Sequence, residues 1–206
     1  MDAPGSTETP DPPDWNPCLE RVRAGDEAAA RQLVEDLYPT IIKIVRSHLP
    51  RTVDEEDLAQ DIFLKIFTKL DQFNATSTFP AWVSRIALHT CIDSLRRQRA
   101  RPLFTYADLN TTQSEFLEHA LDSASSSTGT PLSLADPLAR DLLNNLISKL
   151  KPAEQIVIRL LDLEENSVDE TCALTGWGAS KVKVTAMRAR RKLSAQLQDL
   201  EKNARP

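Results

Sequence analysis

Apolar residues recur three or four positions apart through most of this 206-residue chain. That spacing places them on one face of an α-helix, whereas a β-strand would alternate apolar and polar residues. The pattern is clearest over residues 54–70, where Leu58, Ile62, Ile66 and Leu70 repeat every four positions. No segment shows a strand pattern of any strength. The sequence therefore predicts an all-α fold.

Prolines and capping residues divide this pattern into separate helices. Pro50 ends one helix, Pro137 and Pro152 each begin one, and Ser167 with Glu170 forms a capping box. The predicted helical segments are 26–38, 40–49, 54–70, 79 to about 97, 137–150, 152–163, 168–175 and 179 onward. We expect about four helices in each half of the chain.

Two stretches lack the helical pattern and are predicted to lie outside the folded domains. Residues 1–17 hold five prolines and four acids but no base, and such a segment cannot bury enough apolar surface to offset the entropy of ordering. We expect this tail to be disordered. Residues 103–135 include the serine-rich run 123–130 and are expected to form a flexible, protease-sensitive linker. The chain is then predicted as two small helical domains, at 18–102 and 136–206.

Charge is segregated along the chain, although the net charge is only −5. Six bases and no acid fall between Ala179 and Leu193, and four arginines fall between Arg96 and Arg101. The opposite patch consists of Asp54, Glu55, Glu56, Asp57 and Asp61. We therefore expect an acidic partner and a basic partner, each meeting a different face of the protein.

Several classes of protein are disfavoured by what the sequence lacks. The three cysteines and three histidines are far apart and include no CxxC pair, so we expect neither a metal site nor a disulfide. No Gly-rich phosphate loop or nucleophile elbow occurs, so we expect no catalytic residue, no cofactor and no enzymatic activity. The N-terminus does not resemble a secretory signal, and no apolar run approaches the ~18 residues of a membrane span. A cytoplasmic protein without membrane insertion is predicted.

The strongest local signal is a helix-turn-helix pattern near the C-terminus. A short helix over 168–175 and a turn at Gly176-Trp177-Gly178 precede a long basic helix. An α-helix fits the major groove of DNA, where its outward residues read base edges. Val182, Ala186, Ala189 and Leu193 are predicted to pack inward, and Lys183, Met187, Arg188 and Arg190 to project outward. The alternative is an ordinary pair of helices with a solvated basic face.

Three features of the first half have both a structural and a functional interpretation. Phe79 and Trp82 are typical core residues, but aromatic rings and cations beside the polar loop 74–78 also suit an unstacked single strand. The arginines at 96–101 are either a solvated helix end, favoured by the helix dipole, or part of that surface. The acidic helix 54–70 is either a well-capped amphipathic helix or a docking surface for a basic partner.

The order of these pieces resembles one protein family. Residues 54–65 (DEEDLAQDIFLK), Phe73, 79–82 (FPAW), 85–87 (RIA) and 93–97 (DSLRR) resemble region 2 of bacterial extracytoplasmic-function (ECF) sigma factors, a subfamily of the sigma-70 family. Residues 146–190, from LISKLKP to RAR, resemble region 4 of the same proteins. The resemblance covers about two-thirds of the chain. It implies a transcription initiation factor that binds core RNA polymerase and directs it to promoters.

The resemblance also implies a set of site residues. In the family, the helix matching 54–70 docks on the clamp helices of the polymerase β′ subunit, which assigns Asp57, Gln60, Asp61 and Lys65 to polymerase binding. The loop and helix matching 74–97 melt the −10 element and capture a flipped base, which assigns Asn74, Thr76, Ser77, Phe79, Trp82, Arg85, Arg96 and Arg97. Region 4 reads the −35 element of promoter DNA, which assigns Lys181, Lys183, Val184, Met187, Arg188, Arg191 and Lys192. The β flap of the polymerase and an anti-sigma factor are the further partners that the resemblance implies.

Four features depart from the family pattern. His89 stands where the family usually has Asn, and Thr171 and Cys172 replace Ile-Ala. Gly178 takes the place of a Ser or Thr helix cap, and Ser180-Lys181 replaces Gly-Thr. They indicate a divergent member and leave its promoter preference open. Two alternatives to a sigma factor also stay open: a free-standing helix-turn-helix regulator, which leaves the region 2 resemblance unused, and a sigma-like adaptor that binds only proteins.

Overall fold

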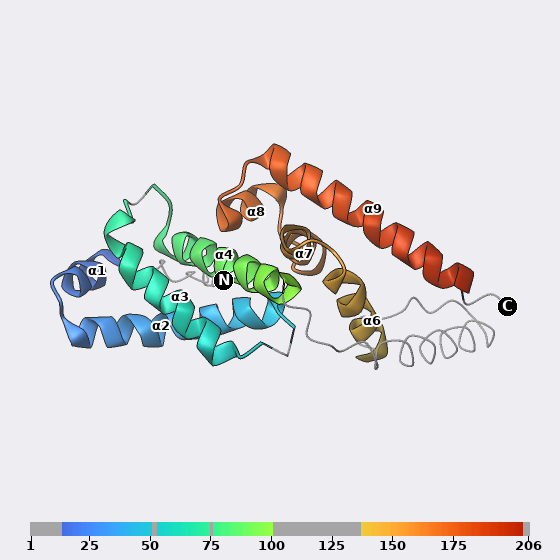
Figure 1. Cartoon of the computed structure of the whole chain (residues 1–206). Coiled ribbons are helices and arrows are strands. Elements are labelled where there is room, and N and C mark those ends of the chain that lie inside the picture. The colour runs from blue at the N-terminus through green and yellow to red at the C-terminus, as the bar shows by residue number, and fades with distance from the viewer. Residues whose placement is uncertain (1–13, 51–52, 75, 101–136, 204–206) are drawn as a thin grey trace, which may run out of the picture.

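A computed structural model describes residues 14–50, 53–74, 76–100 and 137–203. These residues form the helices α1 (Asn16–Arg23), α2 (Glu27–His48), α3 (Glu55–Lys69), η1 (Leu70–Gln72), α4 (Phe79–Ala100), α6 (Pro137–Ser148), α7 (Pro152–Ile158), η2 (Arg159–Leu163), α8 (Val168–Thr175) and α9 (Ala179–Asn203) (Figure 1). No strand occurs among them. The predicted all-α fold is confirmed. The predicted linker and most of the predicted tail lie outside the described residues.

The first domain starts earlier than its predicted boundary at residue 18. Helix α1 begins at Asn16, with Pro17 in its first turn, where a missing backbone N–H leaves no helical bond unmade. Leu19 of α1 is 1% exposed and packs into the core with Trp15 beside it. This apolar contact extends the folded domain into the proline-rich tail.

Residues 26–38 and 40–49 form one helix, α2, where two were predicted. Pro39 lies inside α2 and removes one backbone hydrogen bond, which normally kinks or ends a helix. Leu33, Leu37, Ile41 and Val45 are 0–3% exposed and line a single stripe on both sides of Pro39. Burial of this continuous stripe holds the helix together across the proline. The helix ends where the sequence predicted, before Pro50, with Leu49 in an extended conformation.

Helices α2, α3 and α4 pack against one another and form the core of the first domain (Figure 1). The predicted stripe of α3 is buried, and Ile62 and Ile66 are both 0% exposed. On α4, Val83 and Ala87 are 0% exposed and face the same core. The period read from the sequence therefore identified the inward faces of both helices.

The second domain packs α7, α8 and α9 together, with α6 against α7 and α9. The predicted capping box is present, since Ser167 N donates to Glu170 Oε2 over 2.7 Å and Glu170 N donates to Ser167 Oγ over 3.2 Å. Helix α8 ends at Gly176, whose φ of 71° is the left-handed conformation that glycine adopts most readily. The predicted helix 152–163 is α7 followed by the π-helical turn η2. None of the helices described here combines the length and apolar character needed to cross a bilayer.

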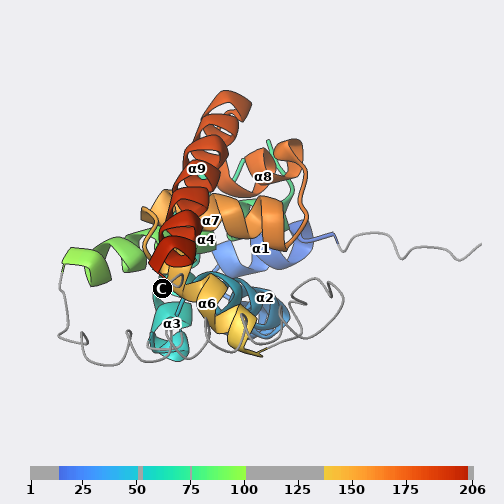
Figure 2. The same cartoon turned by 90° about the vertical axis from the view of Figure 1, so that its right-hand side faces the viewer.

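The two halves of the protein are packed on each other. Helix α4 lies against α7 and α8, and Ile156 and Leu160 join the same hydrophobic cluster as α2, α3 and α4. Helix α9 lies on the side of the second domain away from α2 and α3, as both views of the chain show (Figures 1 and 2). We call the contact of α2 and α4 with α7, η2 and α8 the junction. The junction leaves one side of α9 uncovered.

Candidate functional site

The acids at the start of α3 divide between a structural and an exposed group. Asp54 is the helix cap, and its Oδ1 accepts hydrogen bonds from the backbone N–H groups of Glu56 and Asp57. The side chains of Asp57 and Gln60 are exposed, and that of Asp61 is 48% exposed. Asp61 lies 3.7 Å from the guanidinium of Arg97 on α4. Three of the four residues assigned to polymerase binding therefore share one accessible side of α3.

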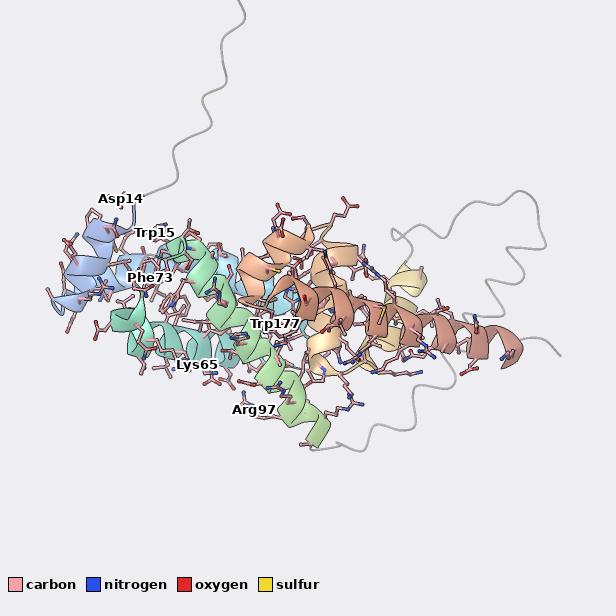
Figure 3. All side chains as sticks on the ribbon, turned by 90° about the horizontal axis from the view of Figure 1, so that it is seen from above. Asp14, Trp15, Lys65, Phe73, Arg97 and Trp177 are labelled. Carbon is pink, nitrogen blue, oxygen red and sulfur yellow. The ribbon has the colours of Figure 1, made fainter. Side chains whose placement is uncertain are left out.

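The fourth assigned residue, Lys65, is held by the protein itself. Its Nζ donates to Thr90 Oγ1 on α4 over 3.1 Å, and its side chain is half-buried. The assignment of Lys65 to polymerase binding stays a prediction, and its ammonium already has a hydrogen-bond partner inside the domain. Figure 3 shows Lys65 on α3 and Arg97 near the end of α4.

A residue that the sequence analysis missed completes the exposed side of α3. Leu64 is 60% exposed, and it lies on the same face as Asp57, Gln60 and Asp61 because residues three and four apart are neighbours on a helix. The spacing 57, 60, 61, 64 was a signal available in the sequence. We name Asp57, Gln60, Asp61 and Leu64 the α3 face.

Four aromatic rings gather where α4 begins. The Phe79 ring lies 5.3 Å from Trp15, 5.3 Å from Phe73 and 5.8 Å from Trp82, measured between ring centroids. Phe79 is 4% exposed, because its ring is covered by its neighbours and supports the cluster from inside. Its assignment to the −10 DNA stays a prediction. Trp82 remains half-buried, with one part of its surface accessible. The labels of Trp15 and Phe73 in Figure 3 mark this end of the domain.

The loop before α4 is held in shape by its own polar groups. Asn74 Oδ1 accepts from Thr76 N over 3.3 Å and from Thr76 Oγ1 over 2.9 Å. Arg23 of α1 donates to the carbonyl oxygens of Leu70 and Phe73, over 3.0 Å and 3.2 Å, where the loop leaves η1. Asn74 and Thr76 are exposed, and Ser77 is half-buried. The structure therefore presents these polar groups beside the aromatic cluster.

The arginines of α4 differ in what they contact. Arg96 is 65% exposed and pairs with Asp93 one turn earlier, over 3.0 Å. Arg97 is 64% exposed and reaches Asp61. Arg96 and Arg97 therefore both lie at the surface of the first domain. Arg85 instead donates to the carbonyl oxygen of Ala173 on α8 over 3.1 Å. Of the residues assigned to the −10 DNA, Arg85 is the one whose side chain forms a hydrogen bond across the junction.

The junction also brings together residues that depart from the family pattern. The His89 ring stacks on Trp177 with centroids 6.5 Å apart, and Lys181 Nζ lies 3.8 Å from the centre of the Trp177 ring. The backbone at Gly176 lies close to the Arg85 side chain, because a Cβ at Gly176 would lie 2.6 Å from Arg85 Cδ. Figure 3 shows Trp177 between the two halves. Two of the four departures thus meet at one tryptophan.

A buried histidine lies at the other end of the junction. His48 is 2% exposed, and its Nε2 lies 3.5 Å from Glu164 Oε1, beyond η2. Burial, together with the positive charge of Arg159, lowers the pKa of His48 to about 3, so the imidazole is neutral at neutral pH. Burial also raises the pKa of Glu164 above its ordinary value. No partner for His48 Nδ1 occurs among the described residues.

The six bases at the start of α9 divide into two groups of three. Arg190 donates to both carboxylate oxygens of Asp162, over 3.2 Å and 2.6 Å, and Lys181 lies on Trp177. Lys192 Nζ donates to both oxygens of Glu154, over 2.7 Å and 2.8 Å. The other three, Lys183, Arg188 and Arg191, are exposed and form no ion pair within the described part of the chain.

Lys192, which the sequence analysis assigned to the −35 DNA, contacts a buried acid. Its partner Glu154 is 5% exposed. Burial raises the pKa of the Glu154 carboxyl, but hydrogen bonds from Lys192 and the Lys151 backbone bring the pKa below its usual value. The carboxylate of Glu154 is therefore charged, and its contact with Lys192 stabilises the second domain.

The inward and outward sides of α9 are as predicted. Val182, Ala186 and Ala189 are 0–2% exposed, and Leu193 packs beside the cluster that contains Ala189. Lys183, Met187, Arg188 and Arg190 are all exposed. Within the described ranges, no three His, Cys, Asp or Glu side chains come together as a metal site. Cys18, Cys91 and Cys172 are free thiols.

Comparisons with known proteins match both halves of the chain in order. The family model for sigma-70 region 2 matches residues 33–101, and the model for sigma-70 region 4 matches residues 140–193. The chain is similar to the ECF RNA polymerase sigma-E factor of Escherichia coli (strain K12), with 28% identity over 182 residues that cover 88% of this chain and 93% of that protein. It is also similar to the RNA polymerase sigma factor YlaC of Bacillus subtilis (strain 168), with 31% identity over 176 residues that cover 81% and 93%.

Among solved structures, the chain is similar to CnrH in its complex with the cytosolic domain of CnrY. The identity is 26%, the match covers 88% of this chain and 96% of that one, and the TM-score is 0.49. The two family models span α2 to α4 and most of α6 to α9, which are the domains that the structure describes. A free-standing helix-turn-helix regulator would not account for the match to region 2, so this alternative is rejected. The chain therefore belongs to the ECF subfamily of the sigma-70 family, the sigma factors that act with bacterial RNA polymerase in transcription initiation.

Proposed function

We propose that this sigma factor docks on core RNA polymerase through the α3 face, melts the −10 element with the loop 74–78 and α4, and reads the −35 element with α9. The observation that carries the proposal is the exposed side of α9, where Lys183, Arg188 and Arg191 have no partner within the described chain. Unpaired cations on a helix that follows a turn are what a major-groove reader requires. The protein then performs no covalent chemistry, and binding energy drives the opening of the duplex.

The α3 face supports a contact with a basic helical surface. It combines acidic and amide groups with the 60% exposed side chain of Leu64, so the contact has both polar and apolar parts. The resemblance to ECF sigma factors points to the β′ clamp helices as that surface. We propose the β flap as the partner of the second domain, and an anti-sigma factor as a further partner, on the same resemblance.

The loop 74–78 and the accessible part of Trp82 support capture of an unstacked base. Extruding a base costs a few kcal/mol, which stacking and polar contacts must offset. Asn74, Thr76 and Ser77 supply the polar groups, and Arg96 and Arg97 supply exposed cations for the backbone of the strand. In this proposal Phe79 positions the pocket and does not touch DNA.

The junction must open before both promoter elements are bound. The two elements are about 25 base pairs apart by their positions, which is roughly 85 Å along the duplex at 3.4 Å per step. The junction instead places α4 directly against α8, the first helix of the helix-turn-helix. The predicted linker 103–135 can span at most about 110 Å when extended, so the chain is long enough for the two domains to separate.

The proposal is tested by run-off transcription with core polymerase and the full chain on promoters selected from a random library. We expect promoter-dependent transcripts that require both elements. Asp57→Lys with Asp61→Lys should abolish core binding while the fold is kept, because both side chains are accessible. The matched control is Glu20→Lys with Glu35→Lys, which makes the same charge change on exposed positions of α1 and α2. Core binding by the α3 double variant equal to that of the control would refute the docking assignment.

A further inference from the structure

The uncovered side of α9 has an apolar centre. Met187 is 62% exposed and Val184 is 41% exposed, so both are large hydrophobic side chains that the described structure leaves open to solvent. They are three positions apart on a continuous helix, so their side chains are neighbours. Both point away from Val182, Ala186 and Ala189, which are buried.

Free cations surround this apolar pair. At about 100° per residue, Arg191 falls between Val184 and Met187 around the helix axis, one turn further along, while Lys183 and Arg188 fall on opposite flanks. Lys183 is four positions from Met187, and Arg188 is four positions from Val184, so each flanking base adjoins one apolar side chain. Of the six bases at the start of α9, Arg191, Lys183 and Arg188 are the three with neither an acid partner nor a ring contact among the described residues.

This arrangement is more specific than a surface that binds only phosphate. Phosphate groups need cations and hydrogen-bond donors, and exposed Val and Met side chains add nothing to such a contact. In the major groove, the apolar group that a base pair presents is the C5-methyl of thymine. A helix with cations on its flanks and apolar side chains at its centre therefore fits a groove with phosphates at its walls and thymine methyl groups on its floor.

We propose that Val184 and Met187 contact thymine C5-methyl groups in the −35 element and thereby select T·A pairs. The inference depends on the proposed function, in which α9 enters the major groove of that element. It adds the chemical group that is read and the side chains that read it.

The test removes methyl groups from DNA one at a time. The holoenzyme of core polymerase and the full chain binds a duplex selected from a randomised −35 library, and each thymine of the element is replaced in turn by deoxyuridine. We expect about fourfold weaker binding at one or two positions, the change given by ~0.8 kcal/mol for a buried methyl-sized group. No loss at any thymine, with dependence on the −35 element intact, would overturn the inference and leave the proposed function standing.

Variants of Val184 and Met187 identify the thymine that each side chain contacts. Met187→Ala or Val184→Ala should remove the difference between thymine and uracil at one position, and Met187→Leu should keep it. Leu197→Ala is the control, because Leu197 is 44% exposed on the same helix but lies off the face formed by Val184 and Met187. If both alanine variants retain the full thymine preference, other residues read the methyl groups and the inference is wrong. If scrambling the −35 element leaves the affinity of the holoenzyme for the duplex unchanged, the proposed function itself is wrong.

Discussion

The junction and the uncovered side of α9 are both rich in bases, and they differ in where those bases find partners. At the junction, Arg85 and Arg99 donate to the carbonyl oxygens of Ala173 and Leu150, over 3.1 Å and 3.2 Å. On α9, Lys183, Arg188 and Arg191 face solvent without an acid. A count of charges would treat the two regions alike. The contacts therefore separate bases that hold the two halves of the protein together from bases that remain available to a ligand.

The largest effect should come from the base whose partner is most deeply buried. Lys192→Ala would leave the carboxylate of Glu154, which is 5% exposed, without its cation. We expect a loss of about 2–3 kcal/mol in the free energy of unfolding, near the lower end for a broken buried pair because the Lys192 side chain is 41% exposed. Denaturant unfolding measures it. Arg191→Ala, one residue earlier, is the control and should leave stability unchanged.

Acidification should lower the stability of the folded protein through the buried His48 of the junction. Because the pKa of His48 is lowered to about 3, the folded protein resists protonation of this group while the unfolded chain accepts it below about pH 6.5. Stability is therefore lost as pH falls below about 6.5, by about 2 kcal/mol at pH 5. Glu164, whose pKa burial raises, contributes in the opposite direction, because the folded protein gains stability from this carboxyl as pH falls through its raised pKa.

Comparison with a variant separates these two groups. His48→Gln should remove most of the difference between unfolding at pH 7 and at pH 5, because glutamine does not titrate. If the free energy of unfolding depends on pH equally in the variant and the native protein, His48 is not the source of the pH dependence. His119 lies outside the described residues, so His119→Gln should be measured beside it.

Arg188→Ala should have a smaller effect that is confined to certain DNA sequences. A bidentate contact of Arg188 with guanine would be worth ~1–2 kcal/mol of discrimination at one base pair of the −35 element. Binding of the holoenzyme to duplexes that vary at each −35 position measures the effect. A uniform loss on every sequence would instead make Arg188 a phosphate contact.

The smallest expected effect is that of Arg191 on the salt dependence of binding. Removing one phosphate contact should weaken binding to all sequences alike and flatten the slope of log affinity against log salt by about one. Arg191→Ala is compared with Lys192→Ala at a temperature where both are folded. Because Lys192 pairs with Glu154, its variant should keep the native slope, and a flatter slope would place Lys192 among the DNA contacts after all.

Much of the local structure was predictable because its causes lie within a few residues. The cap at Ser167, the stop at Pro50 and the inward positions Val182, Ala186 and Ala189 follow from spacing and from residue type. Pro39 was the local signal that misled, since a buried stripe of four residues outweighed the missing backbone hydrogen bond. The order of motifs along the chain was likewise sufficient to identify the family.

The helices, their inward faces and the kind of protein could all be predicted from residue spacing and motif order. Which side chains already have a partner depends on how the helices pack, because those partners are distant in the chain. Lys65 is bound by Thr90, Arg85 by Ala173 and Lys192 by Glu154, at separations of 25, 88 and 38 residues. Leu64 stays exposed beside buried neighbours of the same chemistry because no other segment packs against its side of α3 within the described chain. A hydrogen bond or an apolar contact acts over a few ångströms of space, so its partner is fixed by packing and is not visible in local sequence.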